Sequence, residues 1–242
     1  QFPKKSIHRR NTGYAVDELL KAAQFEGTEN FNFCKLLSGS EGTLAVTTEI
    51  KISLDPLPDP IEIVVAAHFE SIHESMKSAQ VAMKHEVTAV ELMDKIILDC
   101  TKESIEYSKN RYFVEGDPKA LLMIEFRGKT LEEAMAKGEA LIADLKAAGY
   151  GYAYPIIEPE KVASAWALRA AGLGLLGNIP GDPKAVACIE DTAVDITDLA
   201  DYIDELDGIL AGFNQNPVHY AHAGAGEIHM RPILDLKKAE DV

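Results

Sequence analysis

The pattern of apolar and polar residues divides the chain into alternating strands and helices. Short apolar runs rich in β-branched residues are typical of strands, and apolar positions three or four residues apart are typical of helices. Beyond residue 60 the pattern predicts strands at residues 61–69, 120–128, 152–157, 184–196, 217–224 and 226–234. It predicts helices at residues 71–85, 129–151, 158–172 and 197–213, and an ambiguous segment, 88–100, that continues into a helix.

Two of the expected helices carry local start signals. Ser71 with Glu74, and Thr130 with Glu133, have the spacing of a capping box, in which each side chain bonds a backbone N–H group of the first turn. Gly149 is placed to end the second of these helices, because glycine adopts the left-handed conformation that often closes a helix.

The order of the elements favours an α+β fold. The last two expected strands are joined by a tight turn, so the sheet cannot be wholly parallel. We expect residues 56–242 to form a ferredoxin-like antiparallel sheet with helices on one face. In residues 1–55 the pattern predicts a short strand-and-helix region, with a helix at 15–23 and strands within 43–54. The proline-rich stretch "DPLPDP" (55–60) separates the two parts.

Composition excludes several classes of partner and site. The net charge of −15 argues against nucleic acid, because phosphate contacts need clustered Lys and Arg. The apolar runs are far shorter than the roughly 20 residues of a transmembrane segment. Three widely spaced cysteines, Cys34, Cys100 and Cys188, show no disulfide framework, which favours a reducing, cytoplasmic compartment with peripheral membrane association still open.

One glycine motif matches a cofactor-binding pattern but lacks the structural context that the pattern requires. "GLGLLG" (172–177) matches the dinucleotide-binding pattern, but that pattern must follow a strand and open a helix. Here the preceding residues are helical and "NIPGDP" follows, so we expect these glycines to end a helix.

The stretch "HAGAGEIH" (222–229) is the strongest candidate for chemistry from spacing alone. Its glycines suit a turn and its apolar flanks suit strands, so His222 and His229 could converge across a hairpin. Glu227 lies two residues from His229 and therefore shares its face. A metal site, a catalytic pair and two ordinary histidines remain open, since a catalytic zinc usually takes three protein ligands. His219 should face the other way, as an ordinary polar position.

Two separated stretches then resemble one family. "LLSGSEGTLAVTTEIKISLDPLP" (36–58) is similar to the end of the flavin domain in FAD-linked oxidases of the vanillyl-alcohol oxidase type. "YAHAGAGEIHMRPILDLK" (220–237) resembles the His-x-Gly-Asp-Gly-Asn-Leu-His signature of their C-terminal domain. "RRNTGY", "AVELMD", "WALR" and "IEDTAV" occur in the order that the branch with D-lactate dehydrogenases, the glycolate oxidase flavin subunit and D-2-hydroxyglutarate dehydrogenase has them.

The resemblance implies a domain plan. Residues 1–55 would close an FAD-binding α+β domain, and residues 56–242 would form the substrate-binding cap. The family's Gly-rich pyrophosphate loop and its downstream Glu-His-Gly motif are not found in this sequence, so we expect this chain to be the middle of a longer polypeptide. We expect the longer polypeptide to be the FAD enzyme, and this chain by itself to bind FAD poorly and to be inactive. Some long relatives continue into an iron–sulfur domain, which three scattered cysteines cannot supply; the electron acceptor is left unspecified.

The resemblance also implies site residues. Those lining the FAD would be Gly39, Ser40, Glu41, Gly42, Thr43 and Leu44, with Asn11, Gly13 and Tyr14 near the same wall. Arg169 matches an arginine that grips the carboxylate of a small 2-hydroxy-acid substrate, a task that its planar fork suits. His222 and His229 match two ligands of a divalent metal such as zinc, the third being the downstream glutamate.

Two departures from the family signature affect the metal ligands. Ala225 replaces its Asp and Glu227 its Asn, so Glu227 becomes a candidate third ligand and metal affinity is otherwise expected to be weak. The resemblance thus implies part of an FAD-dependent 2-hydroxy-acid dehydrogenase that acts by hydride transfer to flavin. The alternative from another class is a non-catalytic binding or regulatory module that kept the cap fold.

Overall fold

The computed structural model describes residues 2–7, 9 and 13–242, which divide into two compact units at residues 57 and 58. The first unit has only short helical elements, which are α1 (Val16–Leu19), η1 (Ala23–Phe25) and α2 (Cys34–Leu37). Residues 43–54 form no strand, contrary to expectation, and Val46, Ile50 and Leu54 are largely exposed. A β-branched composition makes a strand only where a neighbouring strand accepts its hydrogen bonds.

The second unit is built on a seven-stranded antiparallel sheet in the order β4-β1-β3-β2-β7-β8-β6. Its strands are β1 (Ile61–Phe69), β2 (Val87–Asp94), β3 (Ala120–Gly128), β4 (Ile156–Ile157), β6 (Ile189–Ala193), β7 (Val218–His222) and β8 (Glu227–Arg231). A separate two-stranded ladder joins β5 (Lys184–Ala185) to β9 (Ile233–Leu234). The expected strand at 184–196 is therefore split between two sheets.

The first half of this sheet confirms the ferredoxin-like expectation. Helix α3 (Ile72–Ala82) connects β1 to β2, and α5 (Leu131–Ala148) connects β3 to β4, which with the strand order 4-1-3-2 gives the split β-α-β arrangement. Both helices begin at the predicted capping boxes: Ser71 accepts from the Glu74 N–H and Thr130 from the Glu133 N–H. Gly149 closes α5 in the left-handed conformation.

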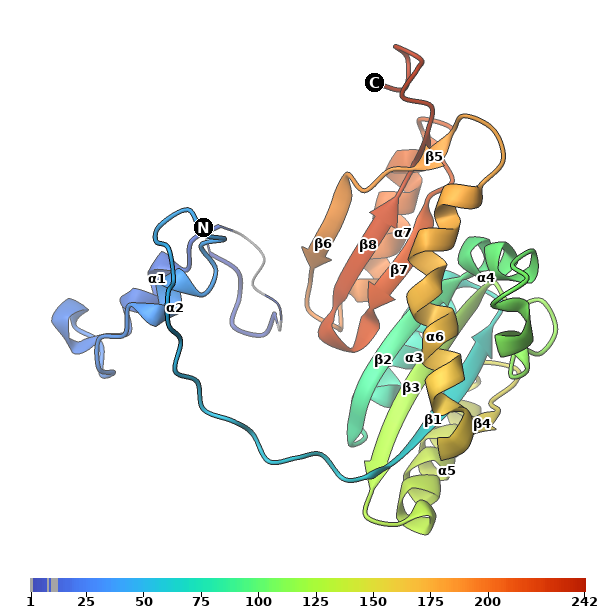
Figure 1. The fold of residues 1–242 in the computed structure, drawn as a ribbon, viewed down its shortest axis with the longest axis horizontal. Coiled ribbons are helices and arrows are strands. Elements are labelled where there is room, and N and C mark those ends of the chain that lie inside the picture. The colour runs from blue at the N-terminus through green and yellow to red at the C-terminus, as the bar shows by residue number, and fades with distance from the viewer. Residues whose placement is uncertain (1, 8, 10–12) are drawn as a thin grey trace. The chain divides into compact units, whose positions relative to one another are not determined.

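Helices cover both faces of the sheet, and not one face as expected. α3, α5 and α7 (Leu199–Ala211) pack on the first face, whereas α4 (Lys95–Lys102) and α6 (Pro159–Leu175) pack on the second (Figure 1). The central strands explain the difference. In β1, Ile63 and Val65 contribute to the first core while Val64 and Ala66 contribute to the second. A continuous apolar run is the signature of a strand that is buried on both sides.

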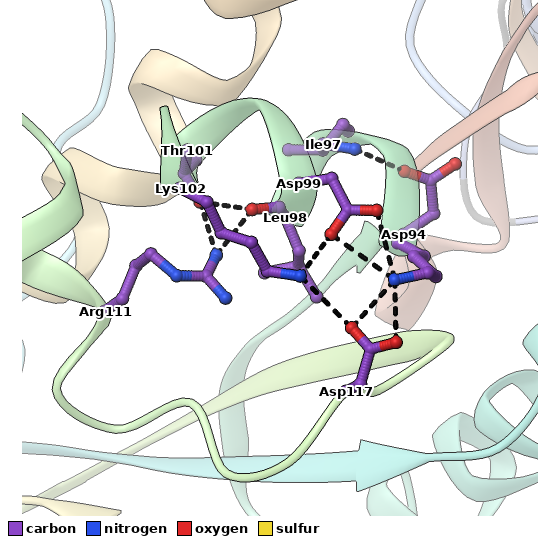
Figure 2. A network of polar contacts seen from close by, with 9 residues as sticks. Asp94, Ile97, Leu98, Asp99, Thr101, Lys102, Arg111 and Asp117 are labelled. Atoms are coloured by element: carbon purple, nitrogen blue, oxygen red, sulfur yellow. Dashed lines mark hydrogen bonds and ion pairs between the residues drawn. The ribbon is translucent and has the colours of Figure 1, made fainter. Parts of the chain in front are cut away.

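Polar side chains at the turn from β2 into α4 form a network of hydrogen bonds and ion pairs (Figure 2). Asp94 ends β2 and caps α4 by accepting the N–H of Ile97 at 2.9 Å. Lys95 and Lys102 both reach Asp99 and Asp117, and their hydrogen bonds, led by that of Lys95, hold the pKa of Asp117 at about 2. The segment 88–100, ambiguous in sequence, is thus a strand followed directly by a helix.

The remaining short elements are η2 (Ser108–Arg111), η3 (Leu176–Asn178) and η4 (Ala223–Ala225). The glycines of "GLGLLG" lie at the end of α6 and in η3, as expected, so they do not open a helix. Within the described residues, none of the helices combines the length and the apolar composition that a membrane crossing requires.

Candidate functional site

The histidine stretch forms the expected hairpin, with both histidines on one face. β7 and β8 pair so that His222 lies opposite Glu227 and Tyr220 lies opposite His229. Residues opposite each other, or two apart on a strand, share a face of the sheet. One potential ligand atom from each of His222, Glu227 and His229 lies within 4.8 Å of the others. The turn therefore gathers three metal-ligand types at one point.

Helix α6 brings an arginine to the same face. Arg169 forms an ion pair with Glu91 of β2 at 2.5 Å, and its guanidinium lies 3.6 Å from the ring centroid of Tyr220, whose hydroxyl it also contacts. Only 11% of the Arg169 side chain is exposed. Burial lowers the pKa of Arg169, and the charge of Glu91 opposes that effect.

The carboxylate of Glu91 links this arginine to the hairpin. Its two oxygens lie 2.9 and 3.0 Å from Nδ1 of His222, and one of them is also the partner of Arg169. The hydrogen bond to Glu91 raises the pKa of His222, while burial of the ring opposes the shift. One acidic side chain therefore holds two of the sequence-predicted site residues.

A second carboxylate does the same for the other histidine. Glu190 of β6 lies 2.5 Å from Nδ1 of His229 and, through its other oxygen, 2.5 Å from Nη2 of Arg231. Asp191 is 3.4 Å from the same Nδ1 atom. The strands that flank the hairpin, β2 and β6, thus each direct one glutamate at one histidine.

These contacts correct one expectation about Arg169. From the sequence we expected the charge of Arg169 to meet the carboxylate of a substrate. In the structure the partner is Glu91, because β2 lies beside β7 in the sheet. Sequence reasoning noted the segments "AVELMD" and "IEDTAV" but did not assign Glu91 or Glu190 to the histidines, and it did not single out Tyr220 or Arg231. Strand order, which brings them together, leaves no local signal.

His219 faces the opposite side of the sheet, as expected, but it is not an ordinary polar position. It is 6% exposed, its Nε2 lies 2.8 Å from Asp207 of α7, and its backbone N–H donates to Asp94 at 2.7 Å. Burial lowers the pKa of His219, yet the contacts of its imidazole with the carboxylates of Asp207, 2.8 Å from Nε2, and Asp94, 3.8 Å from Nδ1, outweigh burial and raise the pKa to about 9.

The loop expected to line FAD is a compact turn in the first unit. Ser40 accepts the N–H of Thr43 at 2.9 Å, and Glu41 and Gly42 have positive φ angles of 51° and 75°. The hydroxyl of Tyr14 lies 2.7 Å from Oγ1 of Thr43, so Tyr14 lies beside the loop, while Leu44 is half-exposed. A Cβ placed on Gly39 would lie 4.0 Å from the carbonyl oxygen of Gly13, so these two glycines are also near each other. Asn11 lies outside the described residues.

Comparison with known proteins places this arrangement in a family. The family model described as "FAD linked oxidases, C-terminal domain" matches residues 60–242. D-2-hydroxyglutarate dehydrogenase of Pseudomonas putida is 30% identical over 98% of this chain, which covers 23% of that protein. The glycolate oxidase subunit GlcD of Bacillus subtilis is 26% identical over 88% of the chain, which covers 43% of it. The chain thus spans about a quarter to under half the length of these relatives.

A solved structure agrees at the level of the fold. The 4-ethylphenol oxidase from Gulosibacter chungangensis, in its isoeugenol complex, superposes with a TM-score of 0.51. It is 11% identical in sequence, and the match covers 76% of this chain and 41% of that one. The family match over residues 60–242 shows that the chain belongs to the FAD linked oxidases and carries their C-terminal domain.

Proposed function

We propose that this chain is part of an FAD-dependent enzyme that oxidises a small 2-hydroxy acid, D-lactate- or glycolate-like, with residues 56–242 as the substrate-binding cap and residues 1–55 as the end of the flavin domain. The observation that carries the proposal is the convergence of Arg169, His222, Glu227 and His229 on one face of a domain from the FAD-linked oxidase family. The named relatives include a D-2-hydroxyglutarate dehydrogenase and a glycolate oxidase subunit.

In this proposal Arg169 binds the substrate carboxylate. Its guanidinium presents several N–H donors in a plane, and Glu91 and Tyr220 hold that plane in position. Nε of Arg169 is buried and makes no hydrogen bond within the described part of the chain. A donor of this kind can be satisfied by an incoming anion, which is what a substrate carboxylate offers.

The residues present fit a divalent metal such as zinc. His222, Glu227 and His229 form a His₂Glu donor set, which is a known combination for catalytic zinc with one position left open. They would hold the metal beside the substrate hydroxyl, where its charge would favour loss of the hydroxyl proton. FAD, when bound, supplies the acceptor for the hydride that leaves the substrate carbon.

The loop of the first unit is the part we assign to FAD. Gly39, Ser40, Gly42 and Thr43 form a tight turn with few bulky side chains, which allows close approach of a cofactor to the backbone. Leu44, Glu41, Gly13, Tyr14 and Asn11 belong to the same proposed wall. We also propose a cytoplasmic location from the cysteine usage; an iron–sulfur domain as acceptor would need cysteines beyond the three of this chain.

Anaerobic reduction of the flavin tests the proposal directly. The longer protein that contains this chain should be purified with its flavin and mixed with D-lactate, L-lactate, glycolate or D-2-hydroxyglutarate. We expect bleaching of the visible flavin bands by at least one of these acids. A protein that holds FAD but is reduced by none of them would contradict the proposed function and favour the non-catalytic module.

A further inference from the structure

The two histidines of the hairpin are held in the same way by two separate strands. Arg169, Glu91 and His222 form one chain of contacts, with Arg169 Nη2 to Glu91 at 2.5 Å and Glu91 to His222 Nδ1 at 2.9 Å. Arg231, Glu190 and His229 form the other, with 2.5 Å at both steps. The two chains enter from opposite sides of the hairpin, because β2 borders β7 and β6 borders β8.

These contacts decide which ring nitrogen of each histidine can bind a metal. A carboxylate accepts a hydrogen bond, so Nδ1 of His222 carries the proton that it donates to Glu91. Nδ1 of His229 forms an ion pair with Glu190 at 2.5 Å, which favours the same protonated Nδ1 over the longer contact, 3.5 Å, of that nitrogen with the Asp191 N–H. In a neutral imidazole the other nitrogen, Nε2, then carries the lone pair. Histidines that bind metals usually have their other ring nitrogen bonded to a carboxylate or carbonyl, which fixes the tautomer and the ring orientation.

The arginines explain why the carboxylates stay in place. Glu91 and Glu190 are 17% and 25% exposed, and each has one cationic partner besides its histidine. An ion pair with an arginine holds a partly buried carboxylate in one orientation, with its remaining lone pairs free to accept. Each glutamate can therefore orient its histidine without itself binding a ligand.

We propose that Glu91 and Glu190 are a matched pair of positioning residues. Each fixes one histidine with Nδ1–H directed outward, so that both Nε2 atoms and the carboxylate of Glu227 face one point where a divalent cation binds. This inference rests on the metal site of the proposed function and adds two residues that act through His222 and His229.

Zinc titration of this chain, with Zn²⁺ in competition with a chromogenic chelator, measures the effect. Glu91→Gln and Glu190→Gln keep the side-chain size but remove the charge and allow the amide to donate to Nδ1. We expect each variant to weaken Zn²⁺ binding by about 10- to 100-fold, the usual cost of losing such a carboxylate. Glu62→Gln is the matched control, because Glu62 pairs with Arg127 at 2.7 Å on the same face and contacts no histidine among the described residues. The Zn²⁺ affinity of this variant should not change.

A second measurement does not depend on the variants folding well. Long-range ¹H–¹⁵N correlation spectra of the metal-free wild-type chain report the tautomer of each imidazole. We expect the Nδ1–H form for His222 and His229. The Nε2–H form in either ring would overturn the inference, as would unchanged Zn²⁺ affinity in both glutamine variants.

Two further outcomes of the Zn²⁺ titration would each contradict the inference in a different way. Loss of affinity in Glu190→Gln alone would place the cation between Glu190, Asp191 and His229, which also converge within 4.8 Å, and would overturn the paired arrangement. A wild-type chain that binds no Zn²⁺ would overturn both this inference and the metal of the proposed function. Flavin reduction by a 2-hydroxy acid would then still stand as a separate result, so the two failures are distinguishable.

Discussion

Arg169 is the residue whose substitution separates a substrate role from a structural one. Lysine keeps the charge but offers a point charge where the guanidinium offers a planar fork, so it cannot bind a carboxylate through two parallel hydrogen bonds. We expect Arg169→Lys in the proposed FAD-dependent enzyme to raise the KM for a 2-hydroxy acid by about 10- to 100-fold, since hydrogen bonds to charged groups contribute roughly 1.5–3 kcal/mol. Steady-state kinetics measure this change.

Arg127→Lys is the control for that experiment. Arg127 also bridges two glutamates, Glu62 and Glu125, on the second face of the sheet. Its replacement should alter the melting temperature more than the KM. If Arg169→Lys lowers only the melting temperature and leaves kcat and KM unchanged, Arg169 is a structural partner of Glu91 and not a substrate ligand.

His219 gives the protein a pH-dependent stability. Its pKa is raised from about 6.5 in the unfolded chain to about 9 in the folded one, by contacts with the carboxylates of Asp207 and Asp94 that exceed the effect of burial. A raised pKa stabilises the fold fully below about pH 6.5, and this stabilisation is lost as the pH rises through about 9. We expect the free energy of unfolding to fall by on the order of 2 kcal/mol over that window, with Asp207 partly exposed and therefore partly screened.

Urea unfolding at about pH 6, pH 7.5 and pH 10 tests the linkage. His219→Gln cannot take up a proton, so its free energy of unfolding should lack this part of the pH dependence. The difference between wild type and variant should therefore be largest at the acidic end. Equal slopes for the two proteins would show that another group titrates.

At the residue scale the sequence identified the candidate site residues and missed the side chains that contact them. His222, His229 and Glu227 lie within eight residues, so a two-residue strand period was enough to place them on one face. Glu91 is 131 residues from His222 and 78 from Arg169. Its position depends on β2 lying next to β7, and no local pattern of residues encodes that neighbour.

The β7–β8 hairpin is the element on which the site depends most. Gly226 has a φ of 69°, and a Cβ there would lie 2.3 Å from the backbone carbonyl oxygen of Val194. Both features oppose any other residue at this position. We expect Gly226→Ala to lower the free energy of unfolding by about 1–3 kcal/mol and to weaken Zn²⁺ binding, as measured by urea unfolding and chelator competition.

Gly174→Ala serves as the comparison. Gly174 lies within α6, and a Cβ there would meet nothing within 4 Å. Alanine in a helix interior should stabilise by roughly 0.5–1 kcal/mol relative to glycine. If Gly226→Ala behaves like Gly174→Ala, the hairpin tolerates a side chain and its conformation does not hold the site.

Elements with a strong local signal were predicted well. Both capping boxes start helices where expected, since the cap and its partner are only three residues apart. Of the expected helix at 15–23, only the short helix α1 forms, and the expected strands at 43–54 do not form. The expectation that the helices cover one face of the sheet was wrong, because the apolar pattern of α6 fits either face equally well. Only the unbroken apolar runs of β1 and β3 indicated that both faces are covered.

On the scale of the whole molecule, the sheet is a ferredoxin-like half extended by a second set of strands. In the first half strands and helices alternate along the chain, so its split β-α-β topology, with strand order 4-1-3-2, could be predicted from that alternation. The second half adds β7, β8 and β6 beyond β2, with β8 between two strands that precede it in the chain. Such an order depends on non-local pairing, which periodicity does not reveal. The candidate site lies in this second half.

The second unit should be stable without residues 1–57. Both of its hydrophobic clusters draw all of their members from residues 61–233, and the connecting segment before them has no regular structure, with Leu54 85% and Leu57 94% exposed. Stability comes chiefly from buried apolar area, so removing residues outside these clusters should cost little. We expect the 58–242 fragment to melt within about 3 °C of the full chain, in one cooperative transition, and to bind Zn²⁺ with the same affinity.

Brief trypsin treatment should cut first at exposed Lys51 and leave this fragment intact. A fragment that unfolds more than about 10 °C lower, or that loses Zn²⁺ binding, would show that the first unit completes the fold or the site of the second.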